Sequence, residues 1–336
     1  MRRNAAGRAN LTSRQLAALI GVSQSAVSRA FTPGSSISPT LRDRILQGAR
    51  EFGYQPNAIA SMLTTRRSNI VGIVVSDMSN PFYPALIGRL TQKLQGVGLQ
   101  SLLFNLTPGS DVETQLLAIR SYNVDAVVVV SATILSESLL SWATEGRRAV
   151  LLNRLSTDGL ATVCVDNVAG ARTVADHFHA LGRRRIGYVG GLSQTLVGMK
   201  RQNAFIDRLA ELNLQFVGAA SRNAYTFEAG ATSAADLMER RPDAIFFASD
   251  ILALGGISAL RAAGHNIPGD VAVAGFDDIE MASWPDYALT SYRQPLEDLV
   301  TAVVNRLSYA DTDMDVPSHE DLPGRLIVRA STVPNL

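Results

Sequence analysis

The chain has 336 residues, of which 46% are hydrophobic and 18% are charged. This length suits two or three domains, and the composition is that of a globular protein, which excludes a disordered chain. No apolar run approaches the roughly 20 residues that a membrane-spanning helix needs, and we recognise no secretion signal, so we expect a cytoplasmic protein.

A single cysteine, Cys164, excludes an intramolecular disulfide and a multi-cysteine zinc site. Its neighbours Val163 and Val165 predict a buried thiol on a strand rather than a reactive one.

The positive charge is concentrated at the beginning of the chain. Residues 1–67 contain ten Arg, no Lys and only two acids, Asp43 and Glu51, which is a net charge of +8. Residues 68–336 contain 21 Lys and Arg against 28 Asp and Glu, a net charge of −7. A compact basic region on an acidic body is typical of proteins that bind a polyphosphate.

Residues 11–56 predict three short helices. Thr12 and Gln15 form the pattern of a capping box, which begins the first helix, and Ser23 can cap the second. Ser38-Pro39 begins the third helix. The apolar residues that we expect to face inward are Leu16, Ala17, Leu19 and Ile20, then Ala26, Val27, Ala30 and Phe31, then Leu41, Ile45, Ala49 and Phe52.

The first two helices are separated by Gly21-Val22-Ser23, which is the arrangement of a helix-turn-helix. Its second helix would present Gln24, Ser25 and Arg29 to base edges in the major groove. The alternative is a small three-helix bundle with a solvated polar face. The charge of +8 favours DNA binding.

After Pro56-Asn57, residues 58–63 predict a short helix with apolar side chains at Ile59, Met62 and Leu63. So short a helix is not stable alone in water, so it must be docked, paired with a partner copy, or disordered until it binds. Residues 64–68 have the composition of a linker.

The rest of the chain alternates buried strands with helices. We expect strands at 70–75, 101–104, 126–130, 149–152, 186–189, 244–248 and 271–274. This alternation predicts doubly wound parallel sheets, whose ligands bind beyond the ends of the strands. Polar residues stand at or near four of these ends, at Asp77, Asn153, Asp250 and Asp277.

These motifs, in this order, resemble the lactose-repressor (LacI/GalR) family of bacterial transcription regulators from about Thr12 to Thr332. Any one match is weak, but the series is specific. The matching stretches are Leu16-Ala17, Gly21-Val22-Ser23, Val27-Ser28-Arg29-Ala30, Gly53-Tyr54-Gln55-Pro56-Asn57, Asn80-Pro81-Phe82-Tyr83, Val124-Asp125-Ala126, Asn153-Arg154, Val165-Asp166-Asn167, Gly275-Phe276-Asp277-Asp278, Arg293-Gln294-Pro295 and Arg329-Ala330-Ser331-Thr332.

The resemblance implies an N-terminal all-α helix-turn-helix headpiece at 1–56, and a hinge helix with a linker at 57–68. It also implies an α/β core at 69–336 with the two-lobed fold of periplasmic sugar-binding proteins, built on two doubly wound parallel sheets. One lobe would hold 69–166 and 294–324, and the other 167–293 and 325–336. The chain would cross between lobes near Asn167, Gln294 and Gly324.

For DNA, the resemblance implies contacts from Thr12, Ser23, Gln24, Ser25, Ser28, Arg29, Tyr54, Asn57 and Leu63. Leu63 would be wedged into the minor groove to bend the duplex, whereas the alternative is an ordinary packing role in the hinge. The chain departs from the family at Ala26, Ser61 and Met62, where Thr, Arg and Ser are usual.

For a small effector, the resemblance implies a cleft lined by Phe82, Tyr83, Asn153, Arg154, Arg201, Ser249, Asp250, Asp277 and Trp284. A sugar or sugar derivative is the usual effector of the family. Ser249 replaces a common Asn. Without the resemblance, Asp277-Asp278 would be interpreted as a solvated turn.

Enzyme signatures are weak. Gly190-Gly191 lacks the rest of a phosphate-binding fingerprint, and no Gly-x-Ser-x-Gly occurs. His177 and His179 are expected on different, solvent-side faces of a helix, and His265 and His319 in polar turns. We therefore expect no catalysis, cofactor or metal. The remaining rival is a plain sugar-binding protein with a basic head.

Palindromic operator DNA would require a homodimer that works at the nucleoid. We expect the dimer face on the body, with the helix at 83–94 as a candidate through Leu86, Ile87 and Leu90, although these residues can equally be core. Val333-Pro334-Asn335-Leu336 cannot form a heptad helix, so we expect a dimer and no tetramer, and no membrane partner.

Overall fold

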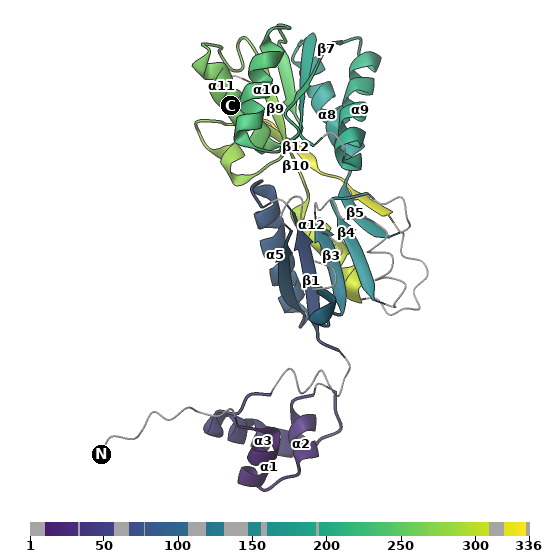
Figure 1. The fold of residues 1–336 in the computed structure, drawn as a ribbon, viewed down its shortest axis with the longest axis vertical. Helices are drawn as coiled ribbons and strands as arrows, with labels where there is room; N and C mark the ends of the chain where they lie inside the picture. The colour runs from purple at the N-terminus through teal and green to yellow at the C-terminus, as the bar shows by residue number, and fades with distance from the viewer. Residues whose placement is uncertain are drawn as a thin grey trace, which may run out of the picture. The chain divides into compact units, whose positions relative to one another are not determined.

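A computed structural model describes residues 11–32, 34–56, 67–76, 78–106, 119–130, 147–155, 160–192, 195–308 and 319–333. The chain divides into two compact units, residues 1–68 and residues 69–336 (Figure 1). We call them the headpiece and the body. No helix in the described ranges has both the length and the apolar character that crossing a membrane requires.

The headpiece contains the three expected helices, α1 (Ser13–Ile20), α2 (Gln24–Ala30) and α3 (Pro39–Phe52). The side chains of Thr12, Ser23 and Ser38 each accept a hydrogen bond from a backbone N–H of the first turn, so all three predicted caps are confirmed. The helices enclose a small core of Leu16, Ala17, Ala26, Val27, Ala30, Ile45 and Ala49.

Two residues expected in this core lie outside it. The side chains of Leu19 and Phe52 are 54% and 48% exposed. Phe31 follows the last residue of α2 and is half-buried. Three helices of 8, 7 and 14 residues cover only a narrow stripe of one another, which leaves the flanks of each apolar face open.

The first sheet of the body has the order β11-β5-β4-β3-β1-β2, and every neighbouring pair is parallel. Its strands are β1 (Ile70–Val75), β2 (Gln100–Asn105), β3 (Ala126–Val130), β4 (Arg148–Leu152), β5 (Ala161–Val165) and β11 (His319–Leu322). Helices α5 (Phe82–Gly96) and α12 (Leu296–Ser308) pack against each other and against strands of this sheet.

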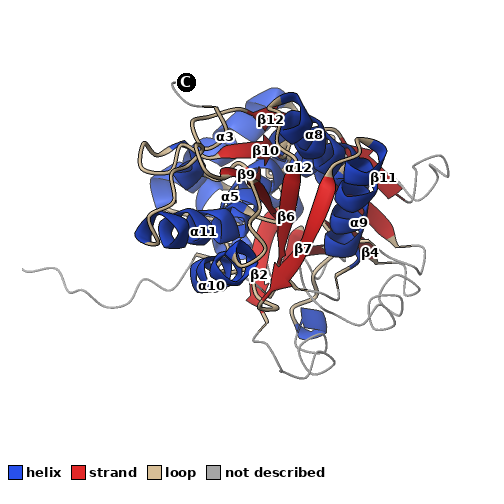
Figure 2. Cartoon of the chain, turned by 90° about the horizontal axis from the view of Figure 1, so that it is seen from above, coloured by secondary structure: helices blue, strands red, loops and turns tan. Residues whose placement is uncertain are grey.

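The second sheet has the order β12-β10-β9-β8-β6-β7. Its strands are β6 (Arg185–Gly190), β7 (Gln215–Ser221), β8 (Ala244–Phe247), β9 (Ala272–Asp277), β10 (Thr290–Arg293) and β12 (Arg325–Ile327). Helices α8 (Asn167–Ala180) and α9 (Leu196–Glu211) pack together on one face, and α10 (Phe227–Met238) and α11 (Asp250–Ala262) on the other (Figure 2). A short 3-10 helix, η1 (Glu280–Ser283), follows β9.

One pairing in the second sheet is not parallel, because β12 runs antiparallel to β10. Only Pro323 and Gly324 separate β12 from β11 of the first sheet, and the chain begins β12 at Arg325, which pairs with Arg293 at the end of β10. It therefore enters the second sheet from the side at which the parallel strands end. The two sheets define two lobes, which we call the first lobe and the second lobe.

All seven expected strands are present, and β1 and β3 have the expected bounds. The burial predicted for Cys164 is confirmed: it lies fully buried in β5, and desolvation raises the pKa of its thiol to about 12. Five further strands are present in the described ranges. Strand β5 was indicated only by the neighbours of Cys164, and β7, β10, β11 and β12 were not predicted. Three of them have only three or four residues and therefore no continuous apolar run, and β7 is half-exposed at a sheet edge and contains Gly and Ala in place of large apolar residues.

Three further expectations need correction. Leu86, Ile87 and Leu90 are buried in the core of the body, so they cannot form a dimer face. His177 is half-buried and its Nε2 lies 2.9 Å from the Thr332 hydroxyl, because α8 packs against the end of the chain, although His179 is exposed as expected. His319 begins strand β11 and does not lie in a turn.

Candidate functional site

Helix α2 separates its apolar and polar residues cleanly. Ala26, Val27 and Ala30 are buried in the headpiece core. The opposite side carries only exposed side chains, which are Ser23, Gln24, Ser25, Ser28 and Arg29. This is the face predicted to contact DNA.

Hydrogen bonds within the headpiece hold this polar face in place. Gln24 Nε2 donates to Ser13 Oγ at 3.1 Å, and the hydroxyls of Ser23 and Ser25 lie 3.0 Å apart. Arg29 Nε donates to the Ser25 carbonyl at 3.3 Å. Among the described residues no hydrogen bond uses the two Nη groups of Arg29, so its guanidinium can still form the bidentate contact with guanine that arginine favours.

The start of α1 lies beside this face. Thr12 and Gln15 form the complete capping box, with Thr12 N donating to Gln15 Oε1 at 2.9 Å. Tyr54 packs on Phe31 with ring centroids 5.6 Å apart, and burial raises the pKa of its phenol although a hydrogen bond with Ser13 lowers it. Ser13 therefore joins α1, Gln24 and Tyr54, a role that its sequence context does not reveal. Asn57 and Leu63 lie outside the described residues.

In the body, Asp277 is the central polar residue. It ends β9, its φ is 116°, and its side chain is almost fully buried. Gln294 Nε2 donates to Asp277 Oδ1 at 2.6 Å, and Asn80 makes a second side-chain hydrogen bond to this carboxyl. Desolvation raises the pKa of Asp277 to about 7, although the nearby charge of Arg201 acts in the opposite direction. The solvated-turn interpretation of this residue is therefore wrong.

Asp278 is also enclosed rather than solvated. Its side chain is 3% exposed, and it forms ion pairs with Arg293 at 2.5 Å and with Arg329 at 2.7 Å. Asp77, the fourth polar residue expected at a strand end, lies outside the described residues.

Asp250, the first residue of α11, is fully buried behind Asp277. Its Oδ1 accepts from Ser291 Oγ at 2.6 Å and its Oδ2 from Ile279 N at 2.9 Å. Desolvation and the negative charge of Asp277 both raise its pKa well above the ordinary value. Because both its oxygens are engaged inside the second lobe, Asp250 is suited to position the segment after β9 rather than to meet a ligand.

Arg201 reaches this region from α9 and is 8% exposed. Its Nε and Nη2 donate to Asn167 Oδ1 at 3.0 and 2.8 Å, and its Nη1 donates to the carbonyl of Ala248. The guanidinium also lies 3.5 Å from the centroid of the Phe276 ring. The cation is thus fixed by the second lobe, and it partly offsets the buried carboxylates.

Gln294 links the two lobes. It is 3% exposed, and its Oε1 accepts from Asn153 Nδ2 at 2.9 Å while its Nε2 donates to Asp277. Asn153 follows β4 with a φ of 54° and also accepts from Val165 N at 3.3 Å. A chain of side-chain hydrogen bonds therefore runs from Asn153 of the first lobe to Asp277 of the second.

A cavity of about 820 Å³ lies beside this chain, and both lobes line it, including Phe82, Asp277, Gln294 and Leu296. Of the nine predicted effector residues, Phe82 and Asp277 line the cavity directly. Asn153, Arg201 and Asp250 are connected to that region through the contacts above.

The other four predicted effector residues are more remote. Tyr83 packs edge-on against Phe82, and the Arg154 guanidinium is half-buried, which lowers its pKa. Ser249 is buried, and its hydroxyl makes no hydrogen bond to a described residue. Trp284 is 49% exposed and does not line the cavity.

Four residues that contribute to this region were not predicted as site residues: Asn80, Asn167, Ser291 and Gln294. Three of them stand in stretches that match the family, yet their side chains gave no local signal of burial. Gln294 becomes a site residue only because the packing of the two lobes places Asn153 and Asp277 on either side of it.

Comparison with known proteins agrees with this architecture. Residues 175–332 match the periplasmic binding protein-like domain family. The HTH-type transcriptional regulator CelR of Thermobifida fusca is 29% identical over 341 residues, covering 95% of this chain and 98% of the relative.

Two solved structures extend the comparison. The Lac repressor dimer bound to operator and the anti-inducer ONPF superimposes with a TM-score of 0.86 at 21% identity, covering 96% of this chain and 99% of the other. This likeness concerns the fold. The complex of the transcriptional regulator CelR with cellobiose gives a TM-score of 0.68 at 26% identity, covering 95% and 99% of the two chains.

Proposed function

We propose that this chain is a transcription regulator of the LacI/GalR family, which binds operator DNA with its headpiece and a small-molecule effector with its body. The observation that carries this proposal is the similarity to HTH-type regulators along nearly the whole chain, headpiece included. The exposed polar face of α2 and the cavity between the lobes support it independently. Repression is the mode that we expect.

In the proposed DNA complex, α2 enters the major groove. Arg29 and Gln24 contact base edges, whereas Ser23, Ser25 and Ser28 contact phosphates or bases at the rim. Thr12 and Tyr54 contact the backbone near the start of α1, where free amide groups favour an anion. Asn57 continues this backbone contact, and Leu63 is wedged into the minor groove.

We propose a carbohydrate as the effector. The region between the lobes offers carboxylate, amide and guanidinium groups next to the Phe82 ring, a combination suited to a molecule with many hydroxyls and one apolar face. A transcriptional regulator named CelR, which is 26% identical to this chain, has been solved with cellobiose. We propose Phe82, Asp277 and Gln294 as residues that line the effector site, and Asn153, Arg201 and Asp250 as residues that position them. The more remote members of the proposed site are Tyr83, Arg154, Ser249 and Trp284. We assign no catalytic role to any of them.

A palindromic operator has two equal halves, so we propose that the working form is a homodimer at the nucleoid. The dimer face belongs to surfaces of the body other than Leu86, Ile87 and Leu90, which are core. Light scattering at micromolar concentration tests this assembly, and a mass near four chains would contradict it.

The test begins with selection of duplexes from a random library by the full chain. The selected duplex is then titrated with the protein in the presence of cellobiose, maltose, galactose and ribose. We expect a palindromic site and a change of at least tenfold in affinity with one class of sugar. Asp277→Asn should remove that response while leaving binding of the bare duplex intact.

The rival function, a sugar-binding protein with an incidental basic head, predicts a different pattern. Sugar would bind, but selection would return no consensus sequence, and sugar would leave DNA affinity unchanged. Isothermal calorimetry on the same sugars separates a failure of effector binding from a failure of coupling.

A further inference from the structure

Lys200 and Asp321 connect the two lobes through their side chains. Lys200 lies on α9 of the second lobe, and its Nζ donates to Asp321 Oδ2 at 2.9 Å. Asp321 lies on β11 of the first lobe. The two side chains are 31% and 25% exposed, so water screens the ion pair only in part.

The carboxylate of Asp321 is held by the first lobe. Oδ2 also lies 3.1 Å from His319 Nε2, and His319 Nδ1 lies 2.5 Å from the hydroxyl of Thr162 on the neighbouring strand β5. Oδ1 is buried without a hydrogen-bond partner among the described residues. Asp321 is therefore a fixed anchor, and Lys200 is the group that reaches it from the second lobe.

Lys200 and Arg201 are consecutive on the same 16-residue helix, yet their side chains bind different lobes. Arg201 turns into the second lobe, to Asn167 and the Ala248 carbonyl, next to Asp277. Lys200 turns outward to the first lobe. Because the helix backbone between them is rigid, a displacement of one residue is transmitted to the other.

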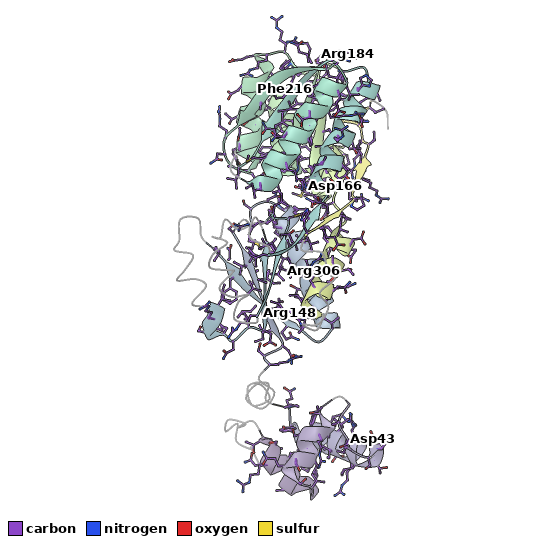
Figure 3. All side chains as sticks on the ribbon, turned by 90° about the vertical axis from the view of Figure 1, so that its right-hand side faces the viewer. Asp43, Arg148, Asp166, Arg184, Phe216 and Arg306 are labelled. Carbon is purple, nitrogen blue, oxygen red and sulfur yellow. The ribbon has the colours of Figure 1, made fainter. Side chains whose placement is uncertain are left out.

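The crossings between the lobes form a separate set of contacts. Asp166 N donates to the Leu322 carbonyl at 2.8 Å, and Gly324 N donates to the Tyr292 hydroxyl at 3.0 Å. Figure 3 labels Asp166 at the point where β5 leads into α8. These ties lie on the covalent connections between the lobes, so they can persist when the lobes rotate. The Lys200–Asp321 pair instead joins β11 to α9, a helix that is not part of any crossing.

We propose that the Lys200–Asp321 ion pair is a clamp that favours the lobe arrangement described here, and that both residues are positioning residues for the effector response. The inference deepens the proposed function, since it concerns how the ligand region near Arg201 is coupled to lobe movement. A partly screened ion pair changes the ratio of two lobe arrangements by about 1.5- to fivefold.

The clamp can be tested without effector or DNA by measuring distances between spin labels on the two lobes. Gln95→Cys on α5 and Ala235→Cys on α10 place labels at exposed positions. The native Cys164 is fully buried and its thiol has a raised pKa, so it stays unlabelled. Labelled chains are mixed with excess unlabelled chain, so that distances within one copy dominate.

In this background, Lys200→Met should raise the minor distance population by about 1.5- to fivefold, and Lys200→Arg should leave it as in the parent. Reversing the pair, with Lys200→Glu and Asp321→Lys together, should return the parent distribution. The matched control is Arg222→Met, which removes an ion pair with Asp236 inside the second lobe and should change nothing.

An unchanged distribution in Lys200→Met, or an equal change in Arg222→Met, would overturn the clamp. If the double variant with the reversed pair does not restore the parent distance distribution, the effect of Lys200→Met comes from lost packing of the lysine side chain and not from the ion pair. None of these results depends on whether the protein binds an operator or a sugar, so failure of the clamp and failure of the proposed function are distinguishable.

Discussion

The headpiece and the body use polar residues in opposite ways. On α2 the polar side chains are exposed on one face, and the two Nη groups of Arg29 make no hydrogen bond to a described residue. In the body Asp250, Asp277, Arg201 and Gln294 are buried and bound to one another or to the backbone. The headpiece is also basic, whereas the body carries a net negative charge. An exposed basic face suits a large, rigid polyanion, and an enclosed network suits a small ligand that replaces internal hydrogen bonds.

This contrast makes the energetic consequences of mutation different in the two regions. Removing an exposed polar group from α2 changes the free energy of unfolding little, but it removes a contact with the binding partner. Removing a buried group from the body leaves its partners without hydrogen bonds, so stability and binding change together. For this reason Asp277→Asn, which keeps the shape of the side chain, is a better test than a truncation.

The largest expected effect comes from separating the two regions. Residues 69–336 alone should not bind the selected duplex, whereas the full chain should bind and lose about a thousandfold in affinity between 50 and 200 mM salt if about six phosphates are contacted. Fluorescence anisotropy across salt concentrations measures both. The fragment 1–68 should bind weakly, because nothing fixes two half-sites. If residues 69–336 bind the duplex as tightly as the full chain, the headpiece is not the DNA-binding region.

The next effect concerns the buried carboxyl of Asp277, whose pKa is raised from 3.8 to about 7. Between about pH 4 and 7 the folded protein keeps a proton that the unfolded chain releases, so this residue makes stability fall as pH rises through that window. Asp277→Asn carries no ionisable proton and should remove on the order of 3 kcal/mol of this pH dependence. Urea unfolding at pH 5 and pH 8 provides the comparison. The same slope in both proteins would mean that Asp277 stays ionised throughout.

A smaller effect is expected at the DNA-binding face. Arg29→Ala should lose about 1–3 kcal/mol of operator affinity and relax the preference at one base pair. Arg50→Ala, an exposed arginine on α3, is the control and should weaken all duplexes equally or not at all. Binding to a set of single-base variants of the operator reports both. Equal changes on every duplex in Arg29→Ala would reassign this residue to a phosphate contact.

The smallest effect tests whether the two regions fold independently. Thr12→Ala removes the capping box of α1 and should destabilise the headpiece by about 1 kcal/mol. Hydrogen exchange on the full chain should therefore speed up about fivefold in peptides from 11–56 and stay unchanged in peptides from the body. Faster exchange in α5 or α9 would show that the body depends on the headpiece.

The local features of this protein can be predicted from its residues alone. The caps at Thr12, Ser23 and Ser38, the polar face of α2 and the strands around Val71, Val128 and Cys164 all follow from residue type and spacing within a few positions. Such signals suffice because each depends on hydrogen bonds and burial patterns within one element. The headpiece, whose functional face is a single short helix, was therefore the more predictable region.

Which polar groups of the body contact one another depends on how the chain packs. Asn153 and Gln294 are 141 positions apart, and Lys200 and Asp321 are 121 apart, yet the side chains of each pair are hydrogen-bonded to each other. Likewise, the exposure of Leu19 and Phe52 and the burial of Leu86 and Leu90 follow from what packs against each helix. Hydropathy and spacing describe one element at a time, whereas these contacts depend on how two sheets and three crossings place distant elements side by side.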